Sequence, residues 1–259
     1  MSAADGPLRR VLITGATGAI GGALALEYAQ PGTMLILQGR RTARLDELAA
    51  ECRGHGALVL TKALDVRDRD ALRAWLTELC ASEPIDLLIV CNGVNINIGA
   101  DRAGEPWPDS ENLIEVNLLA TMATVDAVLP SMRRRQSGQI ALLSSLAGYF
   151  GLPVTPSYCA SKAGIKAYGE ALRGWLAPEG IRVSVIMPGY VKSPMCDGMP
   201  GPKPFLRFPP AAARTIREGL TRDRARISFP FPLNLGSWLL AVLPAALSLR
   251  IVDWLGYRG

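Results

Sequence analysis

The sequence has few residues of the kinds that bind metals or form disulfide frameworks. It contains one histidine, His55, and five scattered cysteines without Cys-x-x-Cys spacing. This composition argues against a zinc site and against a secreted fold held by disulfides. The first ten residues also lack the long apolar run of a signal peptide. We therefore expect no metal and a reducing, cytoplasmic location.

Features of nucleic-acid-binding proteins are also missing. The net charge is only +5, and no basic stripe interleaved with aromatic residues occurs. The one obvious basic run, 133–135, is interpreted as a solvated helix end, with attraction to a cofactor phosphate or a lipid headgroup as the alternative. We expect a small-molecule substrate and no nucleic acid.

Short apolar runs alternate with helical stretches along most of the chain. Such uniformly apolar runs are typical of parallel strands buried on both faces. They cover residues 10–14, 34–37, 58–61, 86–90, 139–143, 182–186 and, last, 226–229. Helical stretches cover 19–29, 42–53, 68–81, 110–134, 157–177 and 211–221. This pattern, with no flexible linker, predicts an α/β fold: a single Rossmann-like doubly wound parallel sheet of about seven strands, flanked by helices on both faces.

The chain changes character after Pro188. Residues 189–210 are rich in proline, and we expect them to form a substrate lid within a catalytic domain that covers 1–228. An apolar C-terminal extension follows at 229–259. Its charge-free stretch, 227–249, reaches transmembrane length but is interrupted by prolines. The extension is interpreted as a hairpin over the pocket or in a subunit interface, as a helix in the membrane interface through 229–255, or as a bilayer span.

A glycine-rich turn follows the first strand directly and leads into a helix. Such a turn lets backbone approach a phosphate, and the helix N-terminus supplies free N–H groups. The residues assigned to this cofactor contact are Gly15, Thr17, Gly18, Ala19, Ile20 and Gly21.

After the second strand, Gly39 is followed by two arginines instead of an acidic residue. An acidic side chain here would bind the adenosine ribose hydroxyls, whereas Arg40 and Arg41 suit a 2′-phosphate. The sequence therefore favours NADP(H) over NAD(H).

With these motifs in order, residues 9 to about 195 resemble the classical short-chain dehydrogenase/reductase (SDR) family. The matching motifs are Thr14-Gly15, Asp65-Val66, Asn117, Ser144-Ser145-Leu146-Ala147-Gly148, Tyr158-x-Ala160-Ser161-Lys162 and Pro188-Gly189. The resemblance implies a catalytic tetrad of Asn117, Ser145, Tyr158 and Lys162. It also implies cofactor contacts from Asp65, Val66, Tyr158, Lys162, Pro188, Gly189, Val191 and Ser193. A homo-dimer or homo-tetramer is expected.

Two motifs depart from the family pattern. Ala19 replaces the middle glycine of the turn, and Gly18 stands one position earlier, a spacing that also fits the extended, sugar-nucleotide-modifying branch. After the fourth strand the family's Asn-Ala-Gly becomes Cys91-Asn92-Gly93, which places a polar Asn92 near the cofactor and, with Gly93, alters the local fit.

Four side chains would together permit the reduction of a carbonyl group. Tyr158 would donate a proton to the developing alkoxide, and the Lys162 ammonium one helical turn later is expected to lower the phenol pKa. Ser145 would hydrogen-bond the substrate oxygen, and the resemblance implies that Asn117 holds a water beside Lys162. The sequence thus predicts an NADP(H)-dependent oxidoreductase that interconverts a carbonyl and a secondary alcohol.

Two other functions remain open at this point. One is an extended-type SDR that epimerises or dehydrates a sugar nucleotide. The other is a non-catalytic protein that binds the cofactor but has lost the chemistry. A lipid-like ketone, a steroid-like ring and a sugar or polyol are equally compatible substrates, and the apolar extension allows a peripheral position on the inner face of a membrane.

Overall fold

A seven-stranded parallel sheet organises the chain. The computed structural model describes residues 8–99 and 101–257. The strand order is β3-β2-β1-β4-β5-β6-β7, and every neighbouring pair is parallel. The strands are β1 (Arg9–Thr14), β2 (Thr33–Gly39), β3 (Leu58–Ala63), β4 (Leu87–Val90), β5 (Gly138–Leu143), β6 (Ile181–Pro188) and β7 (Arg226–Phe229). The predicted fold class is confirmed.

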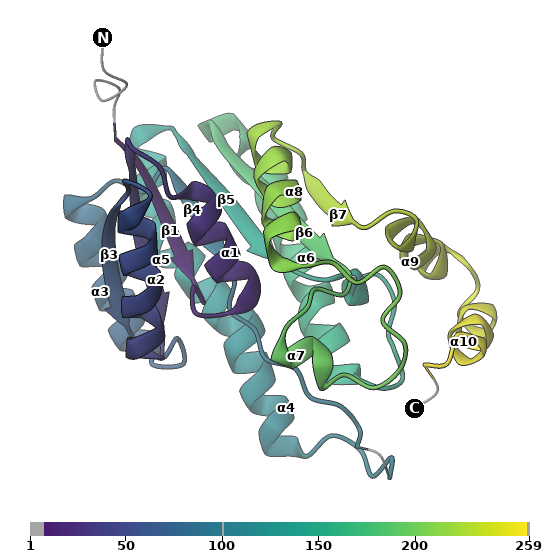
Figure 1. Cartoon of the computed structure of the whole chain (residues 1–259). Helices are drawn as coiled ribbons and strands as arrows, with labels where there is room; N and C mark the ends of the chain where they lie inside the picture. The colour runs from purple at the N-terminus through teal and green to yellow at the C-terminus, as the bar shows by residue number, and fades with distance from the viewer. Residues whose placement is uncertain (1–7, 100, 258–259) are drawn as a thin grey trace.

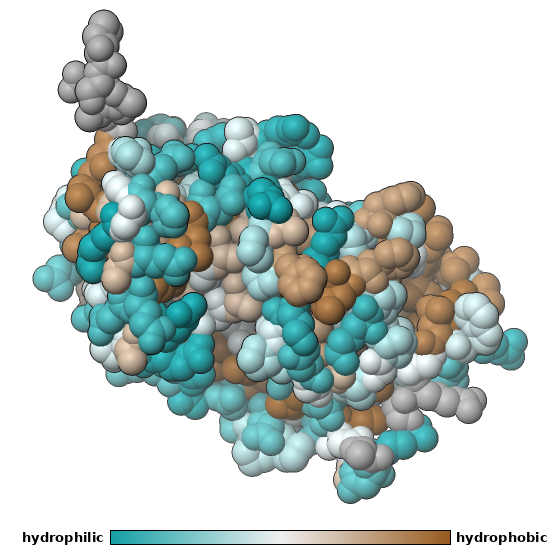
Figure 2. Space-filling model, viewed as in Figure 1, coloured by the Kyte–Doolittle hydropathy of each residue, from teal (hydrophilic) through white to brown (hydrophobic). Residues whose placement is uncertain are grey.

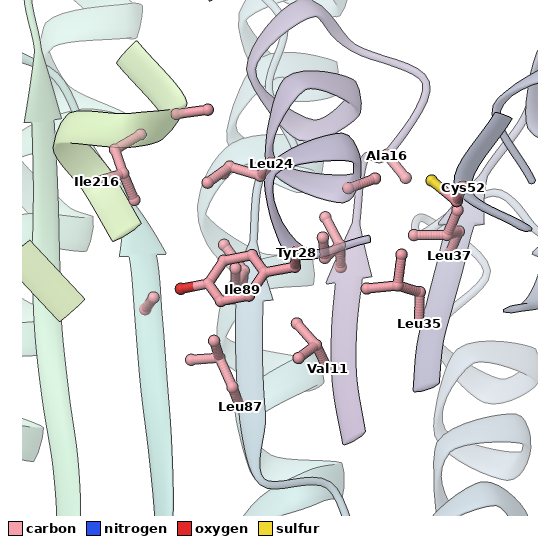
Figure 3. Packing of buried hydrophobic residues seen from close by; sticks show 14 of the residues in the cluster. Val11, Ala16, Leu24, Tyr28, Leu35, Leu37, Cys52, Leu87, Ile89 and Ile216 are labelled. Atoms are coloured by element: carbon pink, nitrogen blue, oxygen red, sulfur yellow. The ribbon is translucent and has the colours of Figure 1, made fainter. Parts of the chain in front are cut away.

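Helices cover both faces of the sheet (Figure 1). One layer comprises α1 (Ala19–Tyr28), α2 (Thr42–Gly54) and α8 (Pro209–Thr221). The other comprises α3 (Arg69–Ser82), α5 (Ala120–Arg135) and α6 (Pro156–Leu176). Figure 3 shows the first layer from close by, where Leu24 and Tyr28 of α1 pack over Val11 and Ile89 of the sheet. Burying these apolar faces on both sides explains why the strands are uniformly apolar.

The strand order reverses between β1 and β4, and this is where a doubly wound sheet opens a crevice. Sequential strands β1, β2 and β3 run toward one edge, and β4 to β7 run toward the other. The loops that leave β1 and β4 therefore separate at the carboxyl end of the sheet. Both the glycine turn and the Cys91-Asn92-Gly93 segment lie in these loops.

The helix expected at 110–134 begins earlier and is not regular. It consists of α4 (Trp107–Ile114), a π-helical turn (Glu115–Leu119) and α5. The π-helical turn contains the buried Asn117, and such turns often occur at functional sites. The stretch Trp107–Arg135 is long and apolar enough to cross a membrane, but half of its most apolar window is buried within the fold, as in the core helix of a globular domain.

The C-terminal part is less regular than the sheet. Two 3-10 turns (Leu146–Gly148 and Ala177–Glu179) flank α6, and the proline-rich segment after β6 includes the one-turn helix α7 (Pro194–Asp197). The chain then ends in α9 (Leu233–Val242) and α10 (Ala245–Trp254), which lie beside the sheet–helix body (Figure 1). Each of these two helices has 10 residues, or about 15 Å, which is too short to span a bilayer.

Candidate functional site

A cavity of about 1100 Å³ opens at the carboxyl ends of the strands. It runs from the first turn of α1, past the ends of β4, β5 and β6, to α9 and α10. Most of the predicted site residues line it: Thr17, Gly18, Ala19, Ile20, Gly21, Arg41, Asn92, Gly93, Ser145, Tyr158, Lys162, Pro188, Gly189, Val191 and Ser193. The predicted residues that do not line it are Gly15, Arg40, Asp65, Val66 and Asn117.

In the glycine turn, the backbone packs closely against the segment after β4 and against the start of α1. Gly15 has φ +65°, and a Cβ added to it would lie 2.8 Å from the carbonyl carbon of Cys91. A Cβ on Gly21 would collide with the Gly15 carbonyl oxygen, so α1 can approach the turn this closely only with glycine there. Gly18 is the N-cap of α1, which leaves backbone N–H groups of the first helical turn directed at the cavity.

Gln38 holds this turn in place, a role that the sequence analysis missed. Its buried side chain accepts a hydrogen bond from the Gly15 N–H (3.1 Å) and donates one to the Leu64 carbonyl (2.6 Å). The turn after β1 is thereby tied to the end of β3. The signal in the sequence was a glutamine inside an otherwise apolar strand, since a buried amide needs polar partners.

The cationic end of the cavity differs in detail from the predicted arginine pair. Arg41 lines the cavity and donates a hydrogen bond to the Thr17 carbonyl. Arg40 instead lies 3.8 Å from the Asp65 carboxylate. The second arginine that lines the cavity is Arg44, in the first turn of α2 and three residues after the N-cap Arg41, and its guanidinium also donates to the Glu47 carboxylate (2.9 Å). A spacing of three was the signal that could have found it.

The Asp65 carboxylate is occupied by a neighbouring side chain. Arg67 donates hydrogen bonds to both of its oxygens, at 2.7 to 3.2 Å. These bonds are the main reason why the pKa of Asp65 is lowered. Val66, the next residue, is buried in the core. Asp65 therefore contributes to the rim of the cofactor end as a fixed, charged group and does not line the cavity itself.

Ser145, Tyr158 and Lys162 meet in the middle of the cavity. The Ser144 hydroxyl donates to the Lys162 carbonyl (2.7 Å), which joins the end of β5 to α6. A Cβ on Gly148 would lie 2.8 Å from that same carbonyl, so the glycine of the Ser-Ser-x-Ala-Gly motif is needed for this close packing. The Lys162 ammonium donates to the Leu143 carbonyl (2.9 Å) and lies 5.5 Å from the centroid of the Tyr158 ring.

The protonation of this pair differs from the expectation. Burial raises the pKa of Tyr158 to about 12, and a hydrogen bond with Ser145 only partly offsets it. Burial likewise lowers the pKa of Lys162 to about 8. In this structure the phenol pKa is raised and not lowered as expected, because removal of the phenolate from water outweighs the hydrogen bond with Ser145, the one contribution that lowers the pKa.

Asn117 supports the site from behind. Its side-chain oxygen accepts from the Val94 N–H (2.8 Å), and its side-chain nitrogen donates to the Val94 carbonyl and the Ser161 hydroxyl (both 3.0 Å). A Cβ on Gly93 would lie 3.6 Å from the Lys162 Nζ and 3.7 Å from the Asn117 Oδ1. Asn117 thus fixes the loop after β4 beside Lys162.

Asn92 and Cys91 occupy the position where the sequence departs from the family pattern. Both line the cavity, and Asn92 is 5% exposed. Its side-chain nitrogen has no hydrogen-bond partner among the described residues. An unpartnered buried donor is costly, so its position on a cavity wall fits a polar ligand there. Cys91 is a thiol whose pKa burial raises to about 12, so it is uncharged.

The comparisons with known proteins agree with this geometry. The family model described as short chain dehydrogenase matches residues 9–200. The chain belongs to the short-chain dehydrogenase family. An uncharacterized oxidoreductase of Myxococcus xanthus is 36% identical over 237 residues, which cover 91% of this chain and 93% of that protein. Human estradiol 17-beta-dehydrogenase 11 is 28% identical, with 96% of this chain and 86% of that protein covered.

A solved short-chain dehydrogenase is similar over nearly the whole chain. The enzyme from Sphingobium yanoikuyae, in complex with NADPH, has a TM-score of 0.81 and 26% identity, covering 94% of this chain and 96% of its own. The resemblance inferred from the motifs is thereby confirmed. This chain is an oxidoreductase of the short-chain dehydrogenase family, whose members bind a nicotinamide cofactor.

The sequence analysis did not predict which residues line the far end of the cavity, the end beside α9 and α10. It is lined by apolar side chains from the loop after β5, from α9 and from α10, with two tyrosines at its edge. The Tyr190 hydroxyl donates to the Tyr257 hydroxyl (2.9 Å), which donates to the Pro202 carbonyl (2.7 Å). These bonds tie the proline-rich segment to the C-terminal end of the described chain. The roles predicted for this segment and for the extension stay predictions.

Proposed function

We propose that the protein is an NADPH-dependent carbonyl reductase for bulky apolar ketones, with the corresponding secondary alcohol as product. The observation that carries this proposal is the apolar wall of the cavity that Ser145 and Tyr158 also line. That wall is formed by the side chains of Phe150, Leu152, Leu233, Leu240, Leu243, Ile251 and Val252. Such a surface favours an apolar substrate, and a sugar or polyol would leave its hydroxyl groups there without partners.

The cofactor end suits a phosphorylated dinucleotide. The glycine turn and the N-terminus of α1 provide a cradle for the pyrophosphate, and the glycines at 15 and 21 allow the turn to pack against the Cys91 backbone and α1 to approach the turn. Arg41 and Arg44 provide guanidinium groups where a 2′-phosphate would lie, and this supports NADPH over NADH. The NADPH complex of the Sphingobium yanoikuyae enzyme is consistent with this assignment. When bound, the nicotinamide supplies the hydride.

The residues of this chain position the carbonyl and provide the proton. The Ser145 hydroxyl orients the substrate oxygen, and Tyr158 donates a proton to it. Lys162 is a cation held by the Leu143 carbonyl, 5.5 Å from the centroid of the Tyr158 ring, and it would bind the ribose of the cofactor when the cofactor is present. Asn117 keeps the loop beside Lys162 in place and is a positioning residue.

The usual reduced state of cellular NADP favours reduction as the main direction. Tyr158 holds the proton that this direction needs, as any phenol does at neutral pH. Its pKa of about 12 makes it a weaker acid and does not itself favour reduction.

The alternatives find less support in the site. A sugar-nucleotide epimerase would need polar groups along the apolar wall. A non-catalytic protein would have no need to keep Ser145, Tyr158 and Lys162 together in one cavity. We therefore assign the chemistry of a reductase to Ser145, Tyr158 and Lys162.

A panel of ketones tests the proposal. NADPH consumption would be followed with long-chain or polycyclic ketones, with keto-sugars of similar size, and with NADH in parallel. We expect turnover with apolar ketones and NADPH, and at least about tenfold lower kcat/KM with NADH. Preferential turnover of the keto-sugars would refute the assigned substrate class, and absence of turnover with every carbonyl would refute the reductase assignment.

A further inference from the structure

The two C-terminal helices are apolar on both their inner and outer sides. On the inner side, Leu240 of α9 and Val252 of α10 line the cavity. The outer side carries exposed large apolar residues, here called the tail patch: Phe231, Leu235, Trp238, Val242, Leu247 and Trp254. Trp254 is 84% exposed and Phe231 is 74% exposed. Figure 2 shows the apolar surface over α9 and α10 in brown.

This concentration is unusual for a soluble surface, where single exposed apolar residues are normal but contiguous patches mark interaction sites. The stretch 227–249 contains no charged residue. All of α9 lies in the described part of the chain, and none of its residues is fully buried. Packing against the body therefore leaves a large part of the apolar surface of α9 exposed.

The proline-rich segment also carries exposed aromatic residues. Phe205 is 54% exposed and Phe208 is 65% exposed. The hydrogen bond from the Tyr257 hydroxyl to the Pro202 carbonyl holds this segment against the end of the chain. Exposed aromatic residues thus lie on both segments that enclose the far end of the cavity.

The cavity reaches the tail patch. Leu239 and Leu255 both line the cavity, yet they are 42% and 45% exposed. They therefore mark a place where the cavity meets the outer surface, one on α9 and the other on α10. The apolar interior of the cavity is continuous there with the apolar exterior of the helices.

We propose that the tail patch docks on an anionic lipid surface, with α9 and α10 lying in the interface. The two helices are too short to span a bilayer, but tryptophans such as Trp238 and Trp254 suit the boundary between headgroups and acyl chains. Exposed arginines beside the patch, Arg207 and Arg250, and the net charge of +5 complement anionic headgroups.

Charge also decides between lipid and a second copy of the chain. This face carries two exposed arginines, Arg207 and Arg250, against one acidic residue of α10, Asp253, so a second copy would bring net positive surfaces toward each other, whereas an anionic leaflet neutralises them. The bilayer would also cover the cavity mouth at Leu239 and Leu255. A water-insoluble ketone could then pass from the lipid into the cavity without crossing water, a consequence that rests on the proposed function.

Vesicle flotation tests the docking independently of catalysis. The full-length protein would be mixed with vesicles of equimolar phosphatidylcholine and phosphatidylglycerol, or of phosphatidylcholine alone. The variant combines Trp238→Ser and Trp254→Ser, neither of which lines the cavity. The matched control is Trp175→Ser, a tryptophan that is 58% exposed at the C-terminal end of α6, shortly before the start of β6 and outside the cavity.

We expect the wild-type protein and Trp175→Ser to float with anionic vesicles and to bind more weakly at high salt. The double variant should bind at least about tenfold more weakly, because it loses two large apolar side chains from the interface. Three results would overturn the proposal: no flotation of the wild type, equal binding by the double variant, or an equal loss in Trp175→Ser. A wild type that stays in solution as a dimer, with a monomeric double variant, would instead assign the patch to contacts between copies.

Flotation also separates this proposal from the proposed function. A protein that floats but reduces no carbonyl keeps the docking surface and loses the reductase assignment. One that reduces apolar ketones but does not float keeps the reductase and loses the docking surface.

Discussion

The end of the cavity beside α1 is lined by the backbone of the glycine turn and by charged side chains such as Arg41 and Arg44. The end beside α9 and α10 is lined by aliphatic side chains on two loosely buried helices. The first wall is fixed by strand ends, by Gln38 and by Asn117, all of them buried. In the second, α9 has no fully buried residue in the described chain and α10 has only Ser248 and Val252. The contrast separates a rigid end, to which the proposed function assigns the cofactor, from an adaptable end, to which it assigns the substrate.

If the rigid end carries the chemistry, Tyr158→Phe should have the largest effect. Loss of the proton donor should lower kcat at least about 1000-fold, while NADPH binding changes little because the ring remains. Single-turnover NADPH oxidation and fluorescence titration of NADPH measure the two effects. Tyr168→Phe, on the same helix but outside the cavity, is the control and should retain normal activity. Substantial turnover by Tyr158→Phe would disprove the assigned role.

The buried charge of Lys162 at the rigid end should lower the free energy of unfolding, and replacing this lysine tests that expectation. Its folded-state pKa of about 8 lies below its ordinary value of 10.5, so below pH 8 the fold holds a buried charge at a cost of about 3 kcal/mol. Lys162→Met should therefore raise the free energy of unfolding of the cofactor-free protein at pH 7 by about 1–3 kcal/mol, after the lost hydrogen bond to Leu143 is counted.

The stability difference between Lys162→Met and the wild type should change with pH in one direction. Between pH 8 and 10.5 the unfolded chain binds the proton that the folded protein has lost, so the stability of the wild type rises with pH relative to Lys162→Met. Denaturant unfolding at pH 7 and pH 10 should show the advantage of the variant shrinking. Lys166→Met, four residues later and paired with Glu170 (3.0 Å), should show no such change. An advantage that grows with pH would contradict the buried charge.

The two ends also differ in how far the sequence could describe them. The rigid end follows from local rules: a glycine where a Cβ has no room, and Tyr158 and Lys162 one helical step apart. The sequence could not show that Arg44 lines the cavity while Arg40 lies toward Asp65, because this depends on how each side chain turns; the cofactor role predicted for Arg40 stays a prediction. The adaptable end could be recognised only by composition, because apolar residues in 229–255 look alike until packing separates the inner Leu240 from the outer Leu235.

Cofactor choice should depend on the arginines that line the rigid end. Replacing Arg41 and Arg44 together with alanine should raise the KM for NADPH about 10- to 100-fold and leave that for NADH nearly unchanged, since only NADPH loses its charge-assisted contacts. Arg40→Ala should have a smaller effect because Arg40 lies toward Asp65. Steady-state kinetics with both cofactors measure this. Equal losses with NADH and NADPH would show that the arginines do not bind the 2′-phosphate.

At the adaptable end, the inner and outer faces of α9 should behave differently. Leu240→Ala should lower kcat/KM for an apolar ketone about tenfold by removing apolar contact, with an unchanged KM for NADPH. Leu235→Ala, on the same helix but exposed and outside the cavity, should leave both constants unchanged. If the two variants lose activity equally, α9 acts through its overall folding and not through contact with the substrate.

The smallest expected effect lies where the rigid end departs from its family. The buried Asn92 side-chain nitrogen lacks a partner in the described chain and lines the cavity, so a bound cofactor should accept its hydrogen bond. Asn92→Ala restores the family residue and should weaken NADPH binding about three- to tenfold, while stabilising the cofactor-free protein because an unpaired donor is removed. Isothermal titration and thermal unfolding measure the two shifts. Opposite signs in affinity and stability indicate a donor reserved for the ligand, and a loss in both would mean that Asn92 is needed only for the fold.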